Sequence, residues 1–253
     1  MSPSTRTSIE HLQEPYRTAL EQALAWLPSV AEPVGIVVSG SIVRGNPGPS
    51  SDLDIVVLHD GAWRRRVQRR FNGIPAELFF NSPAWLEHSV RDEAARGRPV
   101  MAHMLATGSL VKDTGERMAS AIAAARDVLA RGPALDADAL RRDRYAAACQ
   151  VKDALDFGDA DTADARQALA WAVNAVVRHA YLKANWHLPR PKERLALLAA
   201  VDPDAAGLLS AALGEAPARA RDALRQAADS VLGTRGFFEW DSGPDHSTPE
   251  ADR

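Results

Sequence analysis

The sequence predicts an α+β fold in two domains: a small mixed β-sheet flanked by helices, followed by an all-α helical bundle. Strand patterns alternate with helical patterns over the first half of the chain, whereas from Gly132-Pro133 onward only helical patterns remain. A chain of 253 residues is long enough for two modest domains. We therefore expect domains over residues 1–132 and 133–240. The polar residues 241–253 are expected to form a disordered tail.

The strands of the first domain are expected where short apolar runs are rich in β-branched residues. Gly35–Ser39 and Leu53–Leu58 are two such runs. Asn72-Gly73 lies between two β-compatible segments, and both residues accept the positive φ of a type I′ turn, so strands are expected near 64–71 and 74–80. The helices of this domain are expected at Pro15–Leu27 and at about 83–96, 99–106 and 116–131.

The second domain is expected to be helical throughout. Apolar residues recur at helical spacing from Leu140 to Leu155 and again from Leu169 to Ala180, and Thr162 is placed to cap the second of these helices. Three further segments begin with proline, which is harmless in the first turn of a helix because its missing N–H has no partner there. These helices are expected over Pro191–Ala200, Pro203–Leu213 and Pro217–Leu232.

The composition is that of an ordinary globular protein. Hydrophobic residues make up 46% and charged residues 25% of the chain, which argues against disordered and collagen-like classes. The net charge of -3 supplies no general field for a polyanion, so nucleic acid is not the expected partner. No segment has the run of about 18 apolar residues that spans a bilayer, and a single cysteine, Cys149, fits a reducing compartment. We expect a cytoplasmic protein with no membrane partner.

Two carboxylates stand at the start of the second expected strand. Asp52 and Asp54 are two residues apart, so in a strand both side chains project from the same face. Carboxylates this close repel each other unless a cation lies between them. Because the ligands are oxygens only, the cation expected is Mg²⁺ or Mn²⁺.

A glycine-serine pair lies upstream, where the first expected strand ends. We expect a helical turn to begin at Gly40-Ser41, so that backbone N–H groups and the Ser41 hydroxyl bind a phosphate that approaches without meeting a Cβ. Arg44 follows, and its guanidinium serves either a phosphate or the neighbouring loop. A phosphate-binding turn beside a metal-binding strand predicts a site for a metal-nucleotide complex.

Glu77 is the candidate for a third carboxylate. It lies in the otherwise apolar run 74–80, where a charged group needs a reason to be present. A third carboxylate allows a second metal ion to bind and supplies a general base for an incoming hydroxyl. The alternative is that Glu77 faces solvent on the edge strand of the hairpin.

This pattern resembles the DNA polymerase β-type nucleotidyltransferase superfamily: Gly-Ser, ten residues, Asp-x-Asp in an apolar strand, then an isolated acidic residue in another strand. The length and the helical second half resemble the aminoglycoside nucleotidyltransferases of the streptomycin/spectinomycin type. The resemblance implies that residues 1–132 are the catalytic domain. It also implies transfer of a nucleoside monophosphate, in the first instance AMP from ATP, to a hydroxyl of a small molecule, with two Mg²⁺ ions, or Mn²⁺ in their place, and release of pyrophosphate.

The resemblance assigns roles residue by residue. Gly40 and Ser41 take the place of the family's phosphate-gripping motif. Asp52 and Asp54 match its metal ligands. Glu77 matches the third carboxylate, which binds metal and serves as the catalytic base in the adenylyltransferase group.

In the second domain the resemblance rests on the segment 171–192, which is similar to the family's helix with a basic residue followed by a Pro-Lys pair. Arg178 and Lys192 take these places and are expected to contact the nucleotide. The spacing between them is slightly longer than in the family, so the match of Arg178 is the weaker of the two.

Alternative functions remain open at this point. The acceptor could instead be a protein or an RNA, as in toxin–antitoxin pairs, but those minimal enzymes lack a helical domain of this size. A non-catalytic nucleotide-binding module is disfavoured, because such a module has no need of three carboxylates. The arginine-rich run 64–70 is a nucleic-acid patch or, as we favour, a solvated hairpin strand. The acidic cluster at 153–161 either attracts a polycation or is a solvated turn.

Overall fold

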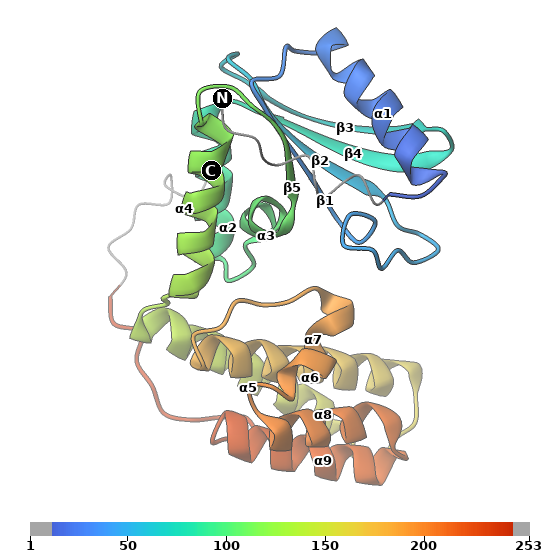
Figure 1. The fold of residues 1–253 in the computed structure, drawn as a ribbon. Coiled ribbons are helices and arrows are strands. Elements are labelled where there is room, and N and C mark those ends of the chain that lie inside the picture. Colours follow the sequence, from blue (N-terminus) through green and yellow to red (C-terminus); the bar gives the residue numbers. More distant parts are fainter. Residues whose placement is uncertain (1–11, 245–253) are drawn as a thin grey trace. The chain divides into compact units, whose positions relative to one another are not determined.

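A computed structural model describes residues 12–244 of the chain (Figure 1). These residues form two compact units that divide after Gly132. The first contains a five-stranded sheet with helices, and the second is helical. This is the α+β class that the sequence predicts. No helix in the described range is long and apolar enough to cross a membrane.

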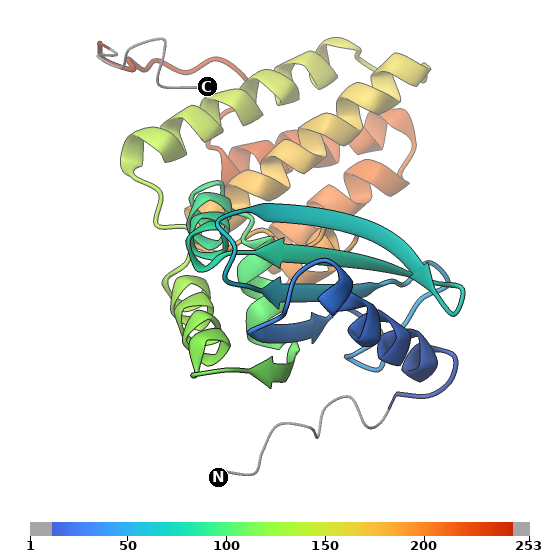
Figure 2. The same ribbon diagram turned by 90° about the horizontal axis from the view of Figure 1, so that it is seen from above.

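The sheet of the first unit has the strand order β3-β4-β2-β1-β5. Figure 2 shows it from teal β3 at one edge to green β5 at the other. Strands β2 and β4 are parallel, and every other neighbouring pair is antiparallel. The strands are β1 (Gly35–Ser39), β2 (Leu53–Leu58), β3 (Arg64–Phe71), β4 (Ile74–Asn81) and β5 (Ser109–Asp113).

The two faces of the sheet pack against different helices (Figure 1). Alternate residues of β2 project to opposite faces. Leu53, Ile55 and Val57 join a core with α1 (Tyr16–Trp26), and Val56 and Leu58 join a core on the other face. That second core includes α2 (Pro83–Ala95), α3 (Val100–Thr107) and α4 (Arg117–Arg131). Since Asp54 alternates with Leu53 and Ile55, its side chain belongs to the face of α2 to α4.

The second unit is built from helices around one core of alanine, leucine and valine. Thr162 caps α6 as predicted: its hydroxyl accepts a hydrogen bond of 3.2 Å from the N–H of Ala165. Asp202 caps α8 in the same way. The helices are α5 (Ala137–Asp156), α6 (Ala163–Lys183), α7 (Arg194–Leu198), α8 (Pro203–Gly214) and α9 (Pro217–Val231).

Most predicted elements are confirmed, but one strand was missed and one expected helix is shorter than predicted. The hairpin turns at Asn72-Gly73, where both residues have positive φ. Strand β5 was not predicted, because its sequence, Ser109–Asp113, is short and mixed, and it becomes a strand only by pairing with β1. The expected helix at Pro191–Ala200 is a 3₁₀ turn, Pro191–Glu193, followed by the single short helix α7. Of the expected tail, residues 245–253 lie outside the described range.

Candidate active site

The register of the sheet brings the three predicted carboxylates together. Strand β4 runs parallel to β2, and Glu77 lies directly beside Asp54. Asp52, one residue before β2, is two residues from Asp54 and shares its face. One carboxylate oxygen from each of Asp52, Asp54 and Glu77 lies within 4.8 Å of the other two. Although Asp52 and Glu77 are 25 residues apart in the sequence, the three acidic residues form one cluster, and each is half-buried.

Glu77 is held from both sides of its carboxylate by the neighbouring strand. Arg66 Nη2 donates a hydrogen bond of 2.5 Å to Oε2, and Gln68 Nε2 donates one to Oε1. The Glu77 side chain is 18% exposed. The alternative of a solvent-facing edge position is wrong, because β3 forms the edge and β4 lies inside the sheet.

Arg66 and Gln68 were not among the predicted site residues, although a signal for Gln68 was present. In a hairpin with a two-residue turn at Asn72-Gly73, residues at equal distances from the turn face each other. Gln68 and Glu77 are such a pair, as the strand register confirms. Arg66 lies two residues further along β3 on the same face, from which its long side chain reaches Glu77 diagonally.

Gly40 lies against the acidic cluster in a conformation suited to glycine. Its φ is +100°, a region that residues with a Cβ rarely adopt. A Cβ at this position would stand 3.0 Å from Asp54 Oδ2 and 3.3 Å from the main-chain oxygen of Asp52. The backbone of the turn after β1 therefore lies directly beside the Asp54 carboxylate.

The expected turn after Gly40 is present over residues 41–45, but no helix follows it, so the expectation of a helix N-terminus at Gly40-Ser41 was wrong. Residues 41–45 are held by hydrogen bonds from Arg44 N to Gly40 O and from Asn46 N to Ser41 O. Because the segment has no further helical turns, a helix dipole does not add to phosphate binding here. The Arg44 side chain is exposed.

The serines around this turn tie it to the loop that precedes Asp52. Ser41 Oγ and Ser51 Oγ are 2.6 Å apart, and Ser51 Oγ accepts a hydrogen bond of 2.8 Å from the N–H of Gly48. Ser51 thus satisfies loop backbone, and the Ser41 hydroxyl lies at the end of the same small network. The loop between β1 and β2 is therefore stabilised by hydrogen bonds among its own residues.

The donor set of this cluster fits a divalent cation. Three carboxylates supply oxygen ligands only, which is the chemistry that Mg²⁺ and Mn²⁺ prefer. A carboxylate oxygen has more than one lone-pair site, so the bonds from Arg66 and Gln68 leave Glu77 able to coordinate. Asp52, Asp54 and Glu77 are therefore the residues that would hold the metal.

The two predicted nucleotide contacts in the second unit differ in their surroundings. Arg178 Nε donates a hydrogen bond of 2.6 Å to Asp143, whose other oxygen lies 3.0 Å from His179 Nδ1. The Asp143 side chain is only 11% exposed, whereas that of Arg178 is 48% exposed. Lys192 is exposed in the 3₁₀ turn and makes no ion pair with any residue from 12 to 244. Asp143 was missed, because one aspartate on a long helix carries no motif.

Two of the four aspartates in the acidic cluster at the end of α5 pair with basic side chains. Lys152 lies 3.4 Å from Asp156, and Arg166 lies 2.7 Å from Asp161. A hydrogen bond from the Arg166 guanidinium lowers the pKa of Asp161. These contacts favour the solvated turn over a binding site for a polycation.

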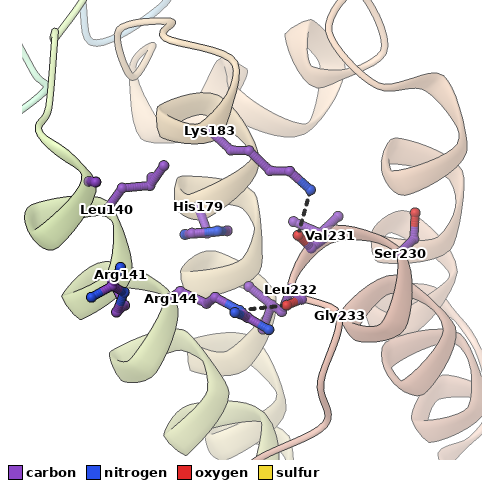
Figure 3. Close-up of a pocket in the computed structure, with 10 residues that line it drawn as sticks. Leu140, Arg141, Arg144, His179, Lys183, Ser230, Val231, Leu232 and Gly233 are labelled. Atoms are coloured by element: carbon purple, nitrogen blue, oxygen red, sulfur yellow. Dashed lines mark hydrogen bonds between the residues drawn. The ribbon is translucent and has the colours of Figure 1, made fainter. Parts of the chain in front are cut away.

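A cavity of about 380 Å³ lies in the second unit beside the end of α9 (Figure 3). Figure 3 shows Lys183 and Arg144 directed at the last carbonyls of this helix: they donate to Val231 O at 3.1 Å and to Leu232 O at 2.7 Å. Basic side chains at a helix C-terminus satisfy its unpaired carbonyls. Two of the residues that line the cavity thus cap α9, and neither Arg178 nor Lys192 lines it.

A comparison with known protein families agrees with this geometry. Residues 18–82 match the family model described as "Nucleotidyltransferase domain", and the matched segment contains Gly40, Ser41, Asp52, Asp54 and Glu77. The match identifies a nucleotidyltransferase domain in this chain and an enzyme of that class. No curated protein matches the chain.

One similar solved structure is a nucleotidyltransferase-like protein from Exiguobacterium sibiricum 255-15. It is 12% identical, with a TM-score of 0.49, and the alignment covers 85% of this chain and 73% of that one.

Proposed function

We propose that the protein transfers a nucleoside monophosphate, AMP from ATP, to a hydroxyl of a small molecule and releases pyrophosphate. The observation that carries the proposal is the meeting of Asp52, Asp54 and Glu77 beside the Gly40 turn, inside a nucleotidyltransferase domain. The paired carboxylates can bind metal ions, and the backbone at Gly40 beside them has no side chain to block a phosphate. Both features suit the binding of a nucleoside triphosphate.

In this proposal the nucleotide is bound by the loop between β1 and β2. The backbone at Gly40-Ser41 and the Ser41 hydroxyl donate to phosphate oxygens, and the exposed guanidinium of Arg44 adds positive charge beside them. The family resemblance also implies nucleotide contacts by Arg178 and Lys192. Support for these last two roles comes from the family resemblance and, for Lys192, from an ammonium group without an ion-pair partner in the described range.

Asp52, Asp54 and Glu77 hold two Mg²⁺ ions, or Mn²⁺ ions, in this proposal. When bound, the ions neutralise charge on the phosphates and on the entering and leaving oxygens. The work of the chain itself is to keep three carboxylates on one face of the sheet. The β2–β4 register places Asp54 beside Glu77.

Glu77 is the general base. It accepts the proton of the acceptor hydroxyl while that oxygen forms a bond to the α-phosphorus and the bond from this phosphorus to pyrophosphate breaks. Arg66 and Gln68 keep the Glu77 carboxylate oriented, because each of its oxygens receives a hydrogen bond from β3. The proton ends on Glu77, and the electron pair leaves with pyrophosphate.

The acceptor that the resemblance implies is an aminoglycoside-like antibiotic, which makes streptomycin and spectinomycin the first compounds to test. Transfer to a protein or to RNA, and nucleotide binding without turnover, are the other outcomes that the same experiment separates.

The test is an incubation of the purified protein with Mg²⁺, each α-³²P-labelled nucleoside triphosphate in turn, and a panel of small hydroxyl compounds, total protein or RNA. We expect a labelled small molecule with ATP. Glu77→Gln should slow the reaction by about 10²–10⁴-fold, the usual contribution of a general base. Glu87→Gln, a matched change on the exposed surface of α2, should leave the rate unchanged. Label on protein or RNA, or nucleotide binding without any labelled product, would contradict the proposal.

A further inference from the structure

Strand β3 carries five arginines: Arg64, Arg65, Arg66, Arg69 and Arg70. The proposed mechanism uses only Arg66. Residues directly opposite each other in an antiparallel pair project to the same face. Gln68 lies opposite Glu77, so Arg64, Arg66, Gln68 and Arg70 share the face of the acidic cluster. Arg65 and Arg69 lie on the opposite face, where Arg69 stacks over Trp26. We call the first set, Arg64, Arg66, Gln68 and Arg70, the β3 strip.

The β3 strip holds more positive charge than its surroundings compensate. Within the described range, Arg66 is the one arginine of β3 in an ion pair, and its partner is Glu77. The Arg64 guanidinium lies 4.4 Å from the centre of the Trp85 ring, and Arg70 Nη1 donates to the carbonyl of Gly73 at 3.0 Å. These contacts orient the guanidinium groups but leave their charge in place.

The β3 strip lies next to Glu77, where the hydroxyl of the acceptor must bind in the proposed mechanism. A hydroxyl that gives its proton to Glu77 must come within about 3 Å of that carboxylate. The remainder of the acceptor then extends over the residues around Glu77, which include its hydrogen-bond donors Arg66 and Gln68. Side chains of alternate residues in a strand are about 6.6–6.8 Å apart, so the strip spans the length of a small molecule.

We propose that the β3 strip binds the acceptor and that the acceptor carries an anionic group, a phosphate or a carboxylate. This inference rests on the proposed transfer to a small hydroxyl compound, and it replaces the aminoglycoside-like acceptor that the resemblance implies with an anionic one. The guanidinium fork matches both anions with two parallel hydrogen bonds. A polycationic aminoglycoside would meet like charge at this face. RNA fits less well, because the net charge is -3 and the indole of Trp85 is covered by Arg64 rather than open for base stacking.

A purely protective role is the alternative to a binding role. Charged side chains on an edge strand prevent pairing with other molecules, and β3 is an edge strand. Protection would be served equally by arginines on both faces. The two faces of β3 therefore provide the test, since Arg70 lies on the face of Glu77 and Arg65 on the other.

The first measurement is calorimetric binding to the full chain with Mg²⁺ and a non-hydrolysable ATP analogue, which occupies the phosphate turn. The probes are glycerol, glycerol 3-phosphate, glycerate, streptomycin and a short single-stranded RNA. We expect the two anionic compounds to bind more tightly than glycerol and streptomycin. Arg70→Gln should raise their Kd about tenfold, the effect of losing one charge-assisted hydrogen bond. Arg65→Gln should leave Kd unchanged.

Equal effects of Arg65→Gln and Arg70→Gln, or no binding of either anionic compound, would overturn the inference and indicate edge protection. Binding of the RNA alone would overturn it in favour of a macromolecular acceptor.

Transfer from labelled ATP to the same probes separates this inference from the proposed function. We expect a higher kcat/KM for glycerol 3-phosphate or glycerate than for glycerol, with KM raised about tenfold and kcat little changed in Arg70→Gln. Faster transfer to glycerol or streptomycin than to the anionic compounds would overturn the inference while the proposed function stands. Tight binding of the anionic compounds without labelled product from any probe would support the anion site and reject nucleotidyl transfer.

Discussion

The two units of this protein place their predicted functional residues in different ways. In the first unit, Asp54 and Glu77 are neighbours because β2 and β4 pair in one register, and Asp52 shares their face. In the second unit, Arg178 is tied to Asp143 on α5, and Lys192 is exposed in a 3₁₀ turn. The register of paired strands fixes which residues from distant parts of the sequence become neighbours. A helical pattern determines only which face of the helix a residue occupies. The first unit therefore holds a formed cluster, and the second holds separate basic side chains.

The largest effect is expected from breaking the cluster of the first unit. Asp54→Asn keeps the shape of the side chain but removes a charged ligand. Loss of an outer-shell partner of a metal typically costs about 10–100-fold in affinity or activity, so loss of a ligand should cost more than about 100-fold in turnover. The measurements are AMP transfer and the affinity for Mn²⁺, with thermal unfolding as the control. Undiminished turnover in a folded Asp54→Asn protein would reject the metal role.

The next effect concerns the turn that approaches the cluster. Gly40→Ala places a Cβ 3.0 Å from Asp54 Oδ2 at a φ of +100°. A residue with a Cβ at positive φ costs about 1–2 kcal/mol, so we expect a lower free energy of unfolding and a lower rate of transfer. Gly207→Ala is a matched control, because a Cβ at that helical glycine of α8 meets open space. Equal stability of the two variants in urea unfolding would show that the Gly40 turn can shift.

Substitutions in the second unit test whether its basic residues act on the nucleotide. Lys192→Ala should raise KM for ATP by about tenfold, the size of one charge-assisted hydrogen bond, without changing the melting temperature. Arg178→Ala should also lower the melting temperature, because the nearly buried Asp143 then keeps only its contact with His179. An unchanged KM for ATP in both variants would restrict Arg178 to a structural role and exclude Lys192 from nucleotide binding.

A smaller effect is expected from the helix cap of the second unit. Thr162→Ala removes the hydroxyl that accepts from the N–H of Ala165, which should lower the free energy of unfolding by about 1 kcal/mol. Transfer activity at temperatures well below unfolding should not change, since Thr162 is not a proposed contact of either substrate. Thr162→Ser, which keeps the hydroxyl, should restore most of the stability. If Thr162→Ser is as unstable as Thr162→Ala, the threonine methyl group and not the hydroxyl cap is responsible for the stability.

The smallest effect is a pH dependence of stability in the first unit. Burial lowers the pKa of His59, and the nearby Asp60 charge opposes this shift. The neutral ring is therefore favoured in the folded state. Its contribution is complete above the unfolded pKa of about 6.5 and is lost as the pH falls through the lower folded value.

Urea unfolding at pH 7.5 and pH 5.5 tests this dependence. The loss of stability at pH 5.5 should be smaller in His59→Gln than in the wild type, and His88→Gln on the exposed surface of α2 serves as control. An equal loss in all three proteins would exclude His59 as the titrating group.

Prediction from the sequence succeeded where local chemistry decides the structure. The hairpin at Asn72-Gly73 follows from two residues that tolerate positive φ. Strand β5 was missed because Ser109–Asp113 acquires its conformation from β1. The turn expected after Gly40 is present over residues 41–45, but no helix follows it, and the loop between β1 and β2 makes hydrogen bonds of its own.

The sequence by itself determined the two-part architecture, the bounds of most elements and the acidic residues of the cluster, because periodicity, turn chemistry and an acid within an apolar run are properties of neighbouring residues. Only the tertiary structure decided that Glu77 lies inside the sheet, that Arg66 and Gln68 hold its carboxylate, and that Asp143 engages Arg178. These contacts join residues from different strands or helices. Their partners are set by strand order and helix packing, which depend on how the whole chain buries its apolar surface.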